Sequence, residues 1–398
     1  MVIDQQGIEK KEKLSKKQLV FLIIGVVGII LGIVCVVVGV LVFGKAKSDG
    51  SFIEPKEDKH ESEIYSDLTG EPLAESSLKT LPAYCIQTPN GTDGARPQAG
   101  LNEAGVVFEA IAEAGITRFA AIYQNPSSAV IGPIRSLRIY YLEWDTPFDC
   151  TIVHAGGASD ALEAVSSGGY KDLSEDYSYM YRGTYGSRLW NNLFTTSNYL
   201  KKFSSDYGYN NSNIKGFSRM TPEESKKSFV DTNVEKALDI LEPTDVDTSD
   251  LSVEINSIDL RLGGWDNFNI HYDYNTETNT YNRSYASGVP HEVYSCPADD
   301  LGEKNPEDVC NLVQISPSVV VAMVVQEHIA SDNYHEDIKA IGMGDVYVFQ
   351  NGTVIKGTWS KSSKDDQIKF FDENNEEILL APGQTFVTAV PDYGSVDY

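Results

Sequence analysis

The sequence predicts an α+β protein: an N-terminal membrane helix, then a mixed α/β domain, then a mainly antiparallel β domain. Three observations predict this arrangement. An uncharged apolar run covers residues 19–43. Strand-like and helix-like patterns alternate between residues 78 and 220, which is typical of mixed layers. From residue 251 to 398 apolar side chains recur at every second position, which is typical of half-buried strands.

The run Leu19–Phe43 is long enough to cross a bilayer. At about 1.5 Å per residue it exceeds a hydrocarbon core of about 30 Å. Its length and the lack of a small-x-small cleavage site favour an uncleaved helix over a signal peptide. The basic tail 1–18 holds five lysines, which the positive-inside rule places in the cytoplasm. We therefore expect a single-pass protein of the cell membrane, attached through residues 19–43, with extracellular C-terminal domains.

Charge restricts the partners that the outer part can have. The chain of 398 residues carries a formal net charge of −26. A surface this acidic repels nucleic acid, so we expect no nucleic-acid partner. Residues 44–77 are polar and lack hydrophobic periodicity, and we expect a flexible tether there.

The first folded unit is expected at residues 78–220. VVFEAIAE and TRFAAIYQ predict two strands joined by a short turn. Pro133 is expected to start a helix through RSLRIYYLEW, in which Arg135 and Arg138 would share one face. CTIVHAG predicts a buried strand that ends in His154, and ASDALEAV predicts the helix that follows it.

The second unit is expected at residues 251–398, after an acidic linker at 221–250. Its strand patterns include SVVVAMVV and QTFVTAVP. Asn351 and Gly352, between VYVF and TVIKGTW, predict a tight hairpin, because both central positions of such a turn favour a positive φ.

Four cysteines follow the apolar run, and an even number permits disulfides in an oxidising compartment. Cys296 and Cys310 flank one polar loop, which a disulfide would close, and Cys85 with Cys150 would then form the second bond. Free buried thiols are the alternative. Neither a C-x-x-C motif nor a histidine-rich pattern occurs, so we expect no metal and no cofactor.

Several stretches resemble one protein family. GARPQAGLNEAGVVFEAIAEAGITRF, IGPIRSLRIYY and TIVHAGGASDAL are similar to the N-terminal domain of the DUF3048 proteins, the YerB-like bacterial lipoproteins. FQNGTVIKGTWSKSSKDDQIKFFDENNEEILLAPGQTFVTAVP resembles the C-terminal domain of the same family. The resemblance implies an extracytoplasmic two-domain architecture and no particular activity. This sequence differs from the lipoproteins of the family at its N-terminus, where an apolar run replaces the lipid anchor.

Arginine is concentrated in the first unit, which holds seven of the nine arginines. Converging guanidinium groups can bind carboxylate or phosphate bidentately, which predicts an anion-binding site. The candidate ligand-binding residues are Arg96, Arg118, Arg135, Arg138, Arg182 and Arg188. The alternative is that these side chains form ion pairs with the protein's own carboxylates.

Glu109, Glu113 and His154 are the candidate catalytic residues. The two glutamates lie four apart, so in a regular strand they face the same side, and a glycoside-cleaving site needs two carboxylates around one bond. His154 is a candidate general base. Ion pairing of the glutamates and a core role for the histidine are the alternatives.

The sequence leaves the activity open, and whether the protein is an enzyme stays undecided. We expect an extracytoplasmic protein that binds an anionic ligand of the cell envelope, such as a glycopolymer, or a protein partner. A hydrolase or transferase that uses a Glu/His acid–base pair is one alternative. A protein-binding scaffold in envelope assembly is the other, because an exposed strand edge can bind a partner chain.

Overall fold

The computed structural model describes residues 64–184, 189–229, 255–296 and 303–398. These residues belong to one compact unit, Ser62–Tyr398. The predicted membrane helix at 19–43 and the basic tail lie outside the described residues. Among the helices that the structure describes, none combines the length and the apolar character that crossing a bilayer requires.

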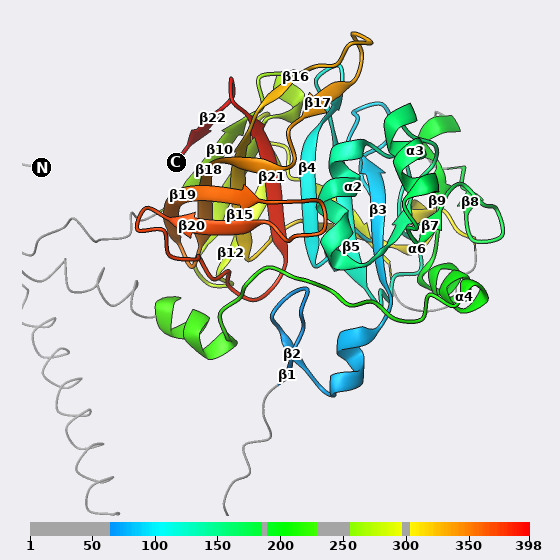
Figure 1. The fold of residues 1–398 in the computed structure, drawn as a ribbon, viewed down its shortest axis with the longest axis horizontal. Coiled ribbons are helices and arrows are strands. Elements are labelled where there is room, and N and C mark those ends of the chain that lie inside the picture. The colour runs from blue at the N-terminus through cyan, green and yellow to red at the C-terminus, as the bar shows by residue number, and fades with distance from the viewer. Residues whose placement is uncertain (1–63, 185–188, 230–254, 297–302) are drawn as a thin grey trace, which may run out of the picture. The chain divides into compact units, whose positions relative to one another are not determined.

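A ten-stranded mixed sheet forms the centre of the unit (Figure 1). Its strands, in spatial order, are β20 (Lys369–Asp372), β19 (Thr353–Lys361), β18 (Gly342–Gln350), β15 (Val319–Val325), β21 (Thr385–Pro391), β4 (Val106–Glu113), β5 (Ile116–Gln124), β3 (Ala83–Pro89), β6 (Thr151–Val153) and β7 (Asp172–Leu173). Strand β21 runs parallel to both of its neighbours, β15 and β4.

Strand β21 joins the two halves of the chain. It pairs with β4 from Thr385 opposite Val106 to Thr388 opposite Glu109. All seven of its residues, TFVTAVP, are buried, so this strand needs cover on both faces and a partner on each edge. The two predicted units, residues 78–220 and 251–398, both contribute strands to this one sheet.

The tight turns follow the sequence pattern. Ala114 and Gly115 connect β4 to β5 with φ of 49° and 76°. Asn351 and Gly352 connect β18 to β19 with φ of 52° and 74°, as the hairpin prediction requires. The structure confirms both hairpins.

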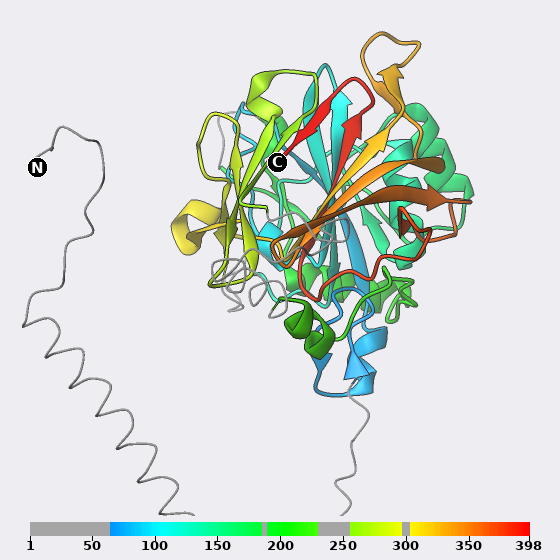
Figure 2. The ribbon, with the colours of Figure 1, turned by 90° about the vertical axis from the view of Figure 1, so that its left-hand side faces the viewer.

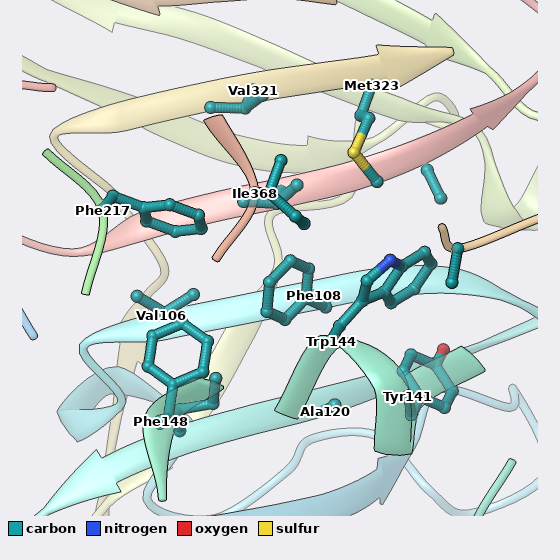
Figure 3. Packing of buried hydrophobic residues seen from close by; sticks show 14 of the residues in the cluster. Val106, Phe108, Ala120, Tyr141, Trp144, Phe148, Phe217, Val321, Met323 and Ile368 are labelled. Atoms are coloured by element: carbon teal, nitrogen blue, oxygen red, sulfur yellow. The ribbon is translucent and has the colours of Figure 1, made fainter. Parts of the chain in front are cut away.

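Two helices, α2 (Ile139–Asp145) and α3 (Ser159–Ser167), cover one face of the sheet (Figure 1). Trp144 of α2 stacks on Phe108 of β4 with ring centroids 5.3 Å apart. Figure 3 shows these rings close to Val321 and Met323 of β15, so one hydrophobic cluster contains residues of both halves. Burial of this cluster stabilises the halves as one body.

The helix that we expected to start at Pro133 starts later, at Ile139. Arg138 precedes it in an extended conformation, with φ −124° and ψ 152°. Leu137 instead bridges to Gly157, and Arg135 donates its backbone N–H to Gln87. Arg135 and Arg138 therefore do not share a helix face, because this segment pairs with neighbouring loops.

A second, four-stranded sheet packs on the opposite face of the large sheet, away from α2 and α3 (Figure 2). Its order is β12 (Thr280–Tyr285), β11 (Ile270–Asn275), β10 (Ser257–Arg261) and β22 (Ser395–Asp397). Helix α4 (Ser197–Tyr207) covers another part of this face with Leu200 and Phe203. The fold is thus α+β, with few helices and extensive sheets.

Shorter elements complete the described chain. They are β1 (Ile64–Tyr65), β2 (Pro72–Leu73), η1 (Ser76–Thr80), η2 (Leu101–Glu103), η3 (Thr146–Phe148), β8 (Tyr181–Arg182), η4 (Leu189–Asn191), β9 (Leu193–Phe194), η6 (Asp266–Phe268), β13 (Glu292–Ser295), α6 (Pro306–Val309), β14 (Asn311–Gln314), β16 (Glu327–Ile329) and β17 (Glu336–Ile338). The first elements lie inside the expected tether 44–77, and Leu68 is buried in the main core. Folded structure therefore begins before residue 78.

Both predicted disulfides are present. Cys85 of β3 is bonded to Cys150, which directly precedes β6, and Cys296 is bonded to Cys310. The first bond ties two neighbouring strands together inside the main core, and the second closes the polar loop. The alternative of free thiols is thus excluded in this structure.

Candidate functional site

The candidate residues gather near one edge of the large sheet. Strands β3, β4 and β6 end at this edge and β5 begins there, because β4 and β3 run antiparallel to β5 while β6 runs parallel to β3. The carboxyl ends of parallel strands are where α/β sheets commonly place ligands. The edge carries Glu113, Arg118 and His154.

Glu109 and Glu113 lie on opposite faces of the sheet, contrary to the expectation from their spacing. The pairing of β4 with β5 shifts between Ile111 and Glu113, which marks a β-bulge. An extra residue in one strand reverses the alternation of the side chains after it. Glu109 therefore points to the second sheet and contacts Arg283, whereas Glu113 points to the helix side and contacts Arg138.

Glu109 lies in a hydrogen-bonded network that joins the two halves of the chain. We call it the closed network, and its members are Glu109, Asn90, Arg96, Gln98, Thr117, Arg283, Tyr285 and His291. Its carboxylate is fully buried, and its Oε2 accepts from Nη2 of Arg283 at 2.7 Å. Its Oε1 accepts from Nδ2 of Asn90 at 3.1 Å and from Oγ1 of Thr117 at 2.9 Å. Because Arg283 comes from β12, this buried ion pair fixes the second sheet on the first.

Asn90 extends the closed network toward the surface. Its Oδ1 accepts from Nε of Arg96 at 2.8 Å, from the hydroxyl of Tyr285 at 3.1 Å and from Nε2 of Gln98 at 3.2 Å. The guanidinium carbon of Arg96 also lies 3.6 Å from the ring centroid of Tyr285, a cation–π contact. Arg96 is thus held by the closed network, away from the other predicted arginines.

His291 completes the closed network as a neutral ring. Arg283 donates a hydrogen bond to Nδ1 of His291. An arginine side chain has no acceptor, so this Nδ1 must accept and carries no proton. The Nε2–H therefore donates to Oε1 of Gln98 at 3.1 Å. Burial and the neighbouring Arg283 lower the pKa of His291 well below its usual value, which agrees with this tautomer.

Glu113 lies in a different environment, which we call the arginine cluster: Glu113 with Arg118, Arg135 and Arg138. Nη2 of Arg118 donates to both oxygens of Glu113, at 2.6 and 2.9 Å. Nη2 of Arg138 donates to Oε2 at 2.5 Å. Burial alone would raise the pKa of Glu113, but Arg118, Arg138 and Arg135 outweigh it, so the pKa is lowered and the group is ionised.

Arg135 is the member of the arginine cluster that is not bonded to the carboxylate. Its Nε is buried without a hydrogen-bond partner, and its guanidinium group donates to no acceptor in the described part of the chain. It is close enough to Glu113 to lower that pKa. One carboxylate thus interacts with three guanidinium groups, and the next carboxylate, Glu336, is close enough to Glu113 for their charges to interact.

A hollow of about 720 Å³ lies beside Arg138, between the start of α3 and the hairpin β16–β17. Its other charged walls are mostly acidic: Asp160, Asp332, Glu336 and Asp337. An anion would therefore be repelled from most of this hollow. Arg138 lines this hollow and Arg135 does not, so the guanidinium group of Arg135 lies outside it.

His154 is held by two oxygen atoms. Its Nδ1 lies 2.7 Å from the carbonyl oxygen of Gly156, and its Nε2 lies 2.9 Å from Oδ1 of Asp172. The side chain is 1% exposed. With both nitrogens directed at acceptors, this ring has no lone pair available for a substrate, which argues against the expected role as a general base.

The remaining predicted arginines do not join the arginine cluster. Arg182 donates to Oε1 of Glu175 at 2.5 Å and to the hydroxyl of Tyr177 at 2.8 Å. Arg188 lies outside the described residues. The structure therefore brings together three of the six predicted ligand-binding arginines, and within the described residues each of the three predicted catalytic residues bonds to a different set of partners.

Sequence reasoning missed Arg283, the partner of Glu109. A signal was present in the strand TYNRSY, where Arg283 alternates with Tyr281 and Tyr285 on one face. An arginine at an inward position of a strand requires a buried partner, because an isolated charge is costly to desolvate.

The fold and the closed network define a class of protein: two sequence halves that share one mixed sheet and are held together by a buried ion pair. The family comparison gives the particular group. Residues 68–210 match the DUF3048 N-terminal domain and residues 259–387 match the DUF3048 C-terminal domain, both described as proteins of unknown function. The chain belongs to the DUF3048 family.

YerB of Bacillus subtilis is similar to most of this chain, both in sequence and in its crystal structure. The protein named "Putative lipoprotein YerB" of Bacillus subtilis (strain 168) is 28% identical over 307 residues, which cover 76% of this chain and 80% of that protein. The crystal structure of YerB protein from Bacillus subtilis matches with a TM-score of 0.64 and 22% identity, over 84% of this chain and all of that chain. The second comparison shows that the fold is shared.

Proposed function

We propose that this protein is an extracytoplasmic, membrane-attached binding protein that holds an anionic group of the cell envelope at Arg135. The observation that carries the proposal is the charge ratio of the arginine cluster. One ionised carboxylate interacts with three guanidinium groups, and the guanidinium group of Arg135 donates to no acceptor within the described residues. The whole chain has a net charge of −26, and a group of arginines with one unbonded guanidinium group in such a chain is explained by the binding of an anion.

The chemistry of Arg135 favours phosphate or carboxylate as the bound group. A guanidinium offers a planar set of donors that matches either anion, and a charge-assisted hydrogen bond is stronger than a neutral one. Arg118 and Arg138 are already bonded to Glu113 and would contribute through their charge. Phosphate-rich glycopolymers are anions of this kind at a bacterial surface.

Three observations support the extracytoplasmic location. Residues 19–43 form an uncharged apolar run behind a lysine-rich tail. Both disulfides belong to an oxidising compartment. A relative carries a name that describes it as a lipoprotein, and a lipid anchor would hold it at a membrane. An apolar helix in place of a lipid would leave the folded part on the same side.

The proposal is tested by binding of poly(glycerol phosphate) to the full chain, purified in an uncharged polyoxyethylene detergent. Arg135→Ala should weaken binding at least about tenfold, the value of one charge-assisted hydrogen bond. Arg261→Ala is the matched control, because Arg261 is an exposed arginine of the second sheet. Equal losses in both variants, or no saturable binding by the unchanged chain, would contradict the proposal.

A further inference from the structure

A second hollow lies between strand β7, the segment that follows β7, and helix α4. Its lining residues differ from those of the arginine cluster. It has a volume of about 730 Å³. Its walls combine aromatic rings with carboxylates, and the residues that matter are Asp172, Glu175, Asp176, Tyr177, Phe203 and Tyr207. We call it the aromatic hollow. From these walls we infer that it binds a sugar ring that carries a free amine.

The aromatic rings are held in place before any ligand arrives. Tyr207 is 55% exposed, yet its ring stacks on Phe203 with centroids 4.5 Å apart and an interplanar angle of 30°. Phe203 in turn packs against Tyr179 at 5.1 Å. A rigid exposed ring backed by other rings presents apolar surface at little entropic cost, and the C–H face of a pyranose can stack on it.

The part of the wall formed by Glu175 and Tyr177 is fixed by hydrogen bonds. Tyr177 is 59% exposed, and its hydroxyl donates to Oε1 of Glu175 at 2.6 Å while it accepts from Nε of Arg182 at 2.8 Å. Arg182 also donates to Oε1 of Glu175. The hydrogen bonds from Tyr177 and Arg182 lower the pKa of Glu175, so this carboxylate stays ionised.

Three carboxylate oxygens in the aromatic hollow are available to a ligand. Asp172 uses Oδ1 for His154, Glu175 uses Oε1 for Tyr177 and Arg182, and Asp176 uses Oδ1 for the backbone N–H of Ser178. The second oxygen of each group accepts no hydrogen bond from the described residues. Sugar hydroxyls and ammonium groups are both donors, so they match this set of acceptors.

Charge selects among sugars. Three carboxylates face two cationic side chains, Arg182 and, when protonated, His154. The aromatic hollow therefore keeps at least one unbalanced negative charge on a body that is itself acidic. An anionic sugar is repelled, a neutral one gains only stacking and hydrogen bonds, and an amino sugar gains an ion pair and a cation–π contact as well.

The test is calorimetric titration of the full chain, in the polyoxyethylene detergent at physiological salt, with three tetramers: glucosamine tetramer, cellotetraose and tetralysine. We expect glucosamine tetramer to bind at least about fivefold more tightly than either of the others, from one stacking or cation–π contact. Tetralysine carries the same number of side-chain amines without a pyranose ring. Equal binding by tetralysine, or no saturable heat with glucosamine tetramer, would overturn the inference.

Variants locate the binding. Tyr207→Ala should weaken glucosamine tetramer about fivefold, and Tyr207→Phe should keep the affinity because it keeps the ring. Tyr334→Ala, at an equally exposed tyrosine outside the hollow, is the control.

Asp176→Asn keeps the Oδ1 acceptor for Ser178 and should abolish the preference for glucosamine tetramer over cellotetraose. Arg135→Ala should change nothing here, which separates this inference from the proposed anion site. Unchanged binding of glucosamine tetramer by Tyr207→Ala would refute the inference that the aromatic hollow binds an amino sugar.

Discussion

Glu109 and Glu113 stand four residues apart on the same strand, and the structure uses them in opposite ways. Glu109 is fully buried and bonded to one arginine, Arg283, with Arg96 close enough for its charge to interact, and its other neighbours donate neutral hydrogen bonds. Glu113 is 8% exposed and interacts with three arginines, one of which, Arg135, has a guanidinium group that donates to no acceptor in the described residues. The closed network thus bonds its carboxylate to partners on all sides, whereas the arginine cluster leaves one guanidinium group without a hydrogen bond in the described residues, and this difference is what the proposed anion site rests on.

The largest expected effect comes from breaking the closed network. Arg283→Met should lower the free energy of unfolding of residues 62–398 by about 3–5 kcal/mol, because it leaves Glu109 buried without its counter-charge. This fragment contains the described hydrophobic clusters and both disulfides, and urea unfolding followed by circular dichroism measures the change. The double variant Glu109→Met with Arg283→Met should be less unstable than Arg283→Met alone. A loss below about 1 kcal/mol in Arg283→Met would show that the pair is not structural.

A smaller loss is expected in the arginine cluster. Glu113→Gln should cost roughly 2–3 kcal/mol, because charged hydrogen bonds to Arg118 and Arg138 are replaced by neutral ones. Added phosphate should restore more stability to this variant than it adds to the unchanged fragment, since an anion can replace the carboxylate. Arg283→Met should show no such additional gain. If phosphate stabilises all three proteins equally, the distinction between the two regions fails.

Acid should affect the closed network before the arginine cluster. Folding lowers the pKa of His291. Below about pH 6.5 this histidine therefore binds a proton in the unfolded chain but not in the folded protein. Stability should fall as pH drops below that value, by at most about 1.4 kcal/mol per pH unit for this one group. The pKa of Glu113 is also lowered, and its contribution is lost only below about pH 4.5.

The measurement is urea unfolding at a series of pH values between about 7 and 5. His291→Gln keeps an acceptor for Arg283 but cannot titrate, so its unfolding free energy should depend less on pH. An identical slope in the variant and the unchanged fragment would exclude His291 as the source.

The smallest effect on stability is expected at Arg135. Arg135→Ala should change the unfolding free energy by no more than about 0.5 kcal/mol, because its guanidinium group makes no hydrogen bond in the described structure. Thermal unfolding beside Arg261→Ala provides the comparison. A loss of about 2 kcal/mol or more would mean that Arg135 is part of the framework and not a ligand-binding group.

Much of the fold follows from local sequence patterns. The alternation in VVFEAIAE and TRFAAIYQ and the Asn351–Gly352 pair predicted β4, β5 and the β18–β19 hairpin, because strands and tight turns are specified by adjacent residues. The parallel pairing of β21 with β4 was not predicted. It joins residues more than 270 positions apart, and no local pattern specifies such a contact.

The candidate site was predicted only in part, for the same reason. The concentration of arginines indicated Arg118, Arg135 and Arg138, although the expected helical spacing of the last two was wrong. The bulge that separates Glu109 from Glu113 depends on the pairing of two strands, and the sequence of one strand does not reveal it. Arg283 and Asp172 become visible as partners only when distant segments meet.

Arginine side-chain NMR tests the contrast between the two regions most directly. Glycerol phosphate would be titrated into residues 62–398 while the Nε–H signals of Arg135 and Arg283 are recorded. Arg135 should shift in a saturable manner, because its guanidinium group makes no hydrogen bond within the described residues, and Arg283 should stay unchanged because its two Nη groups are bonded to Glu109 and His291. A stationary Arg135 signal, or equal shifts of both, would contradict the account.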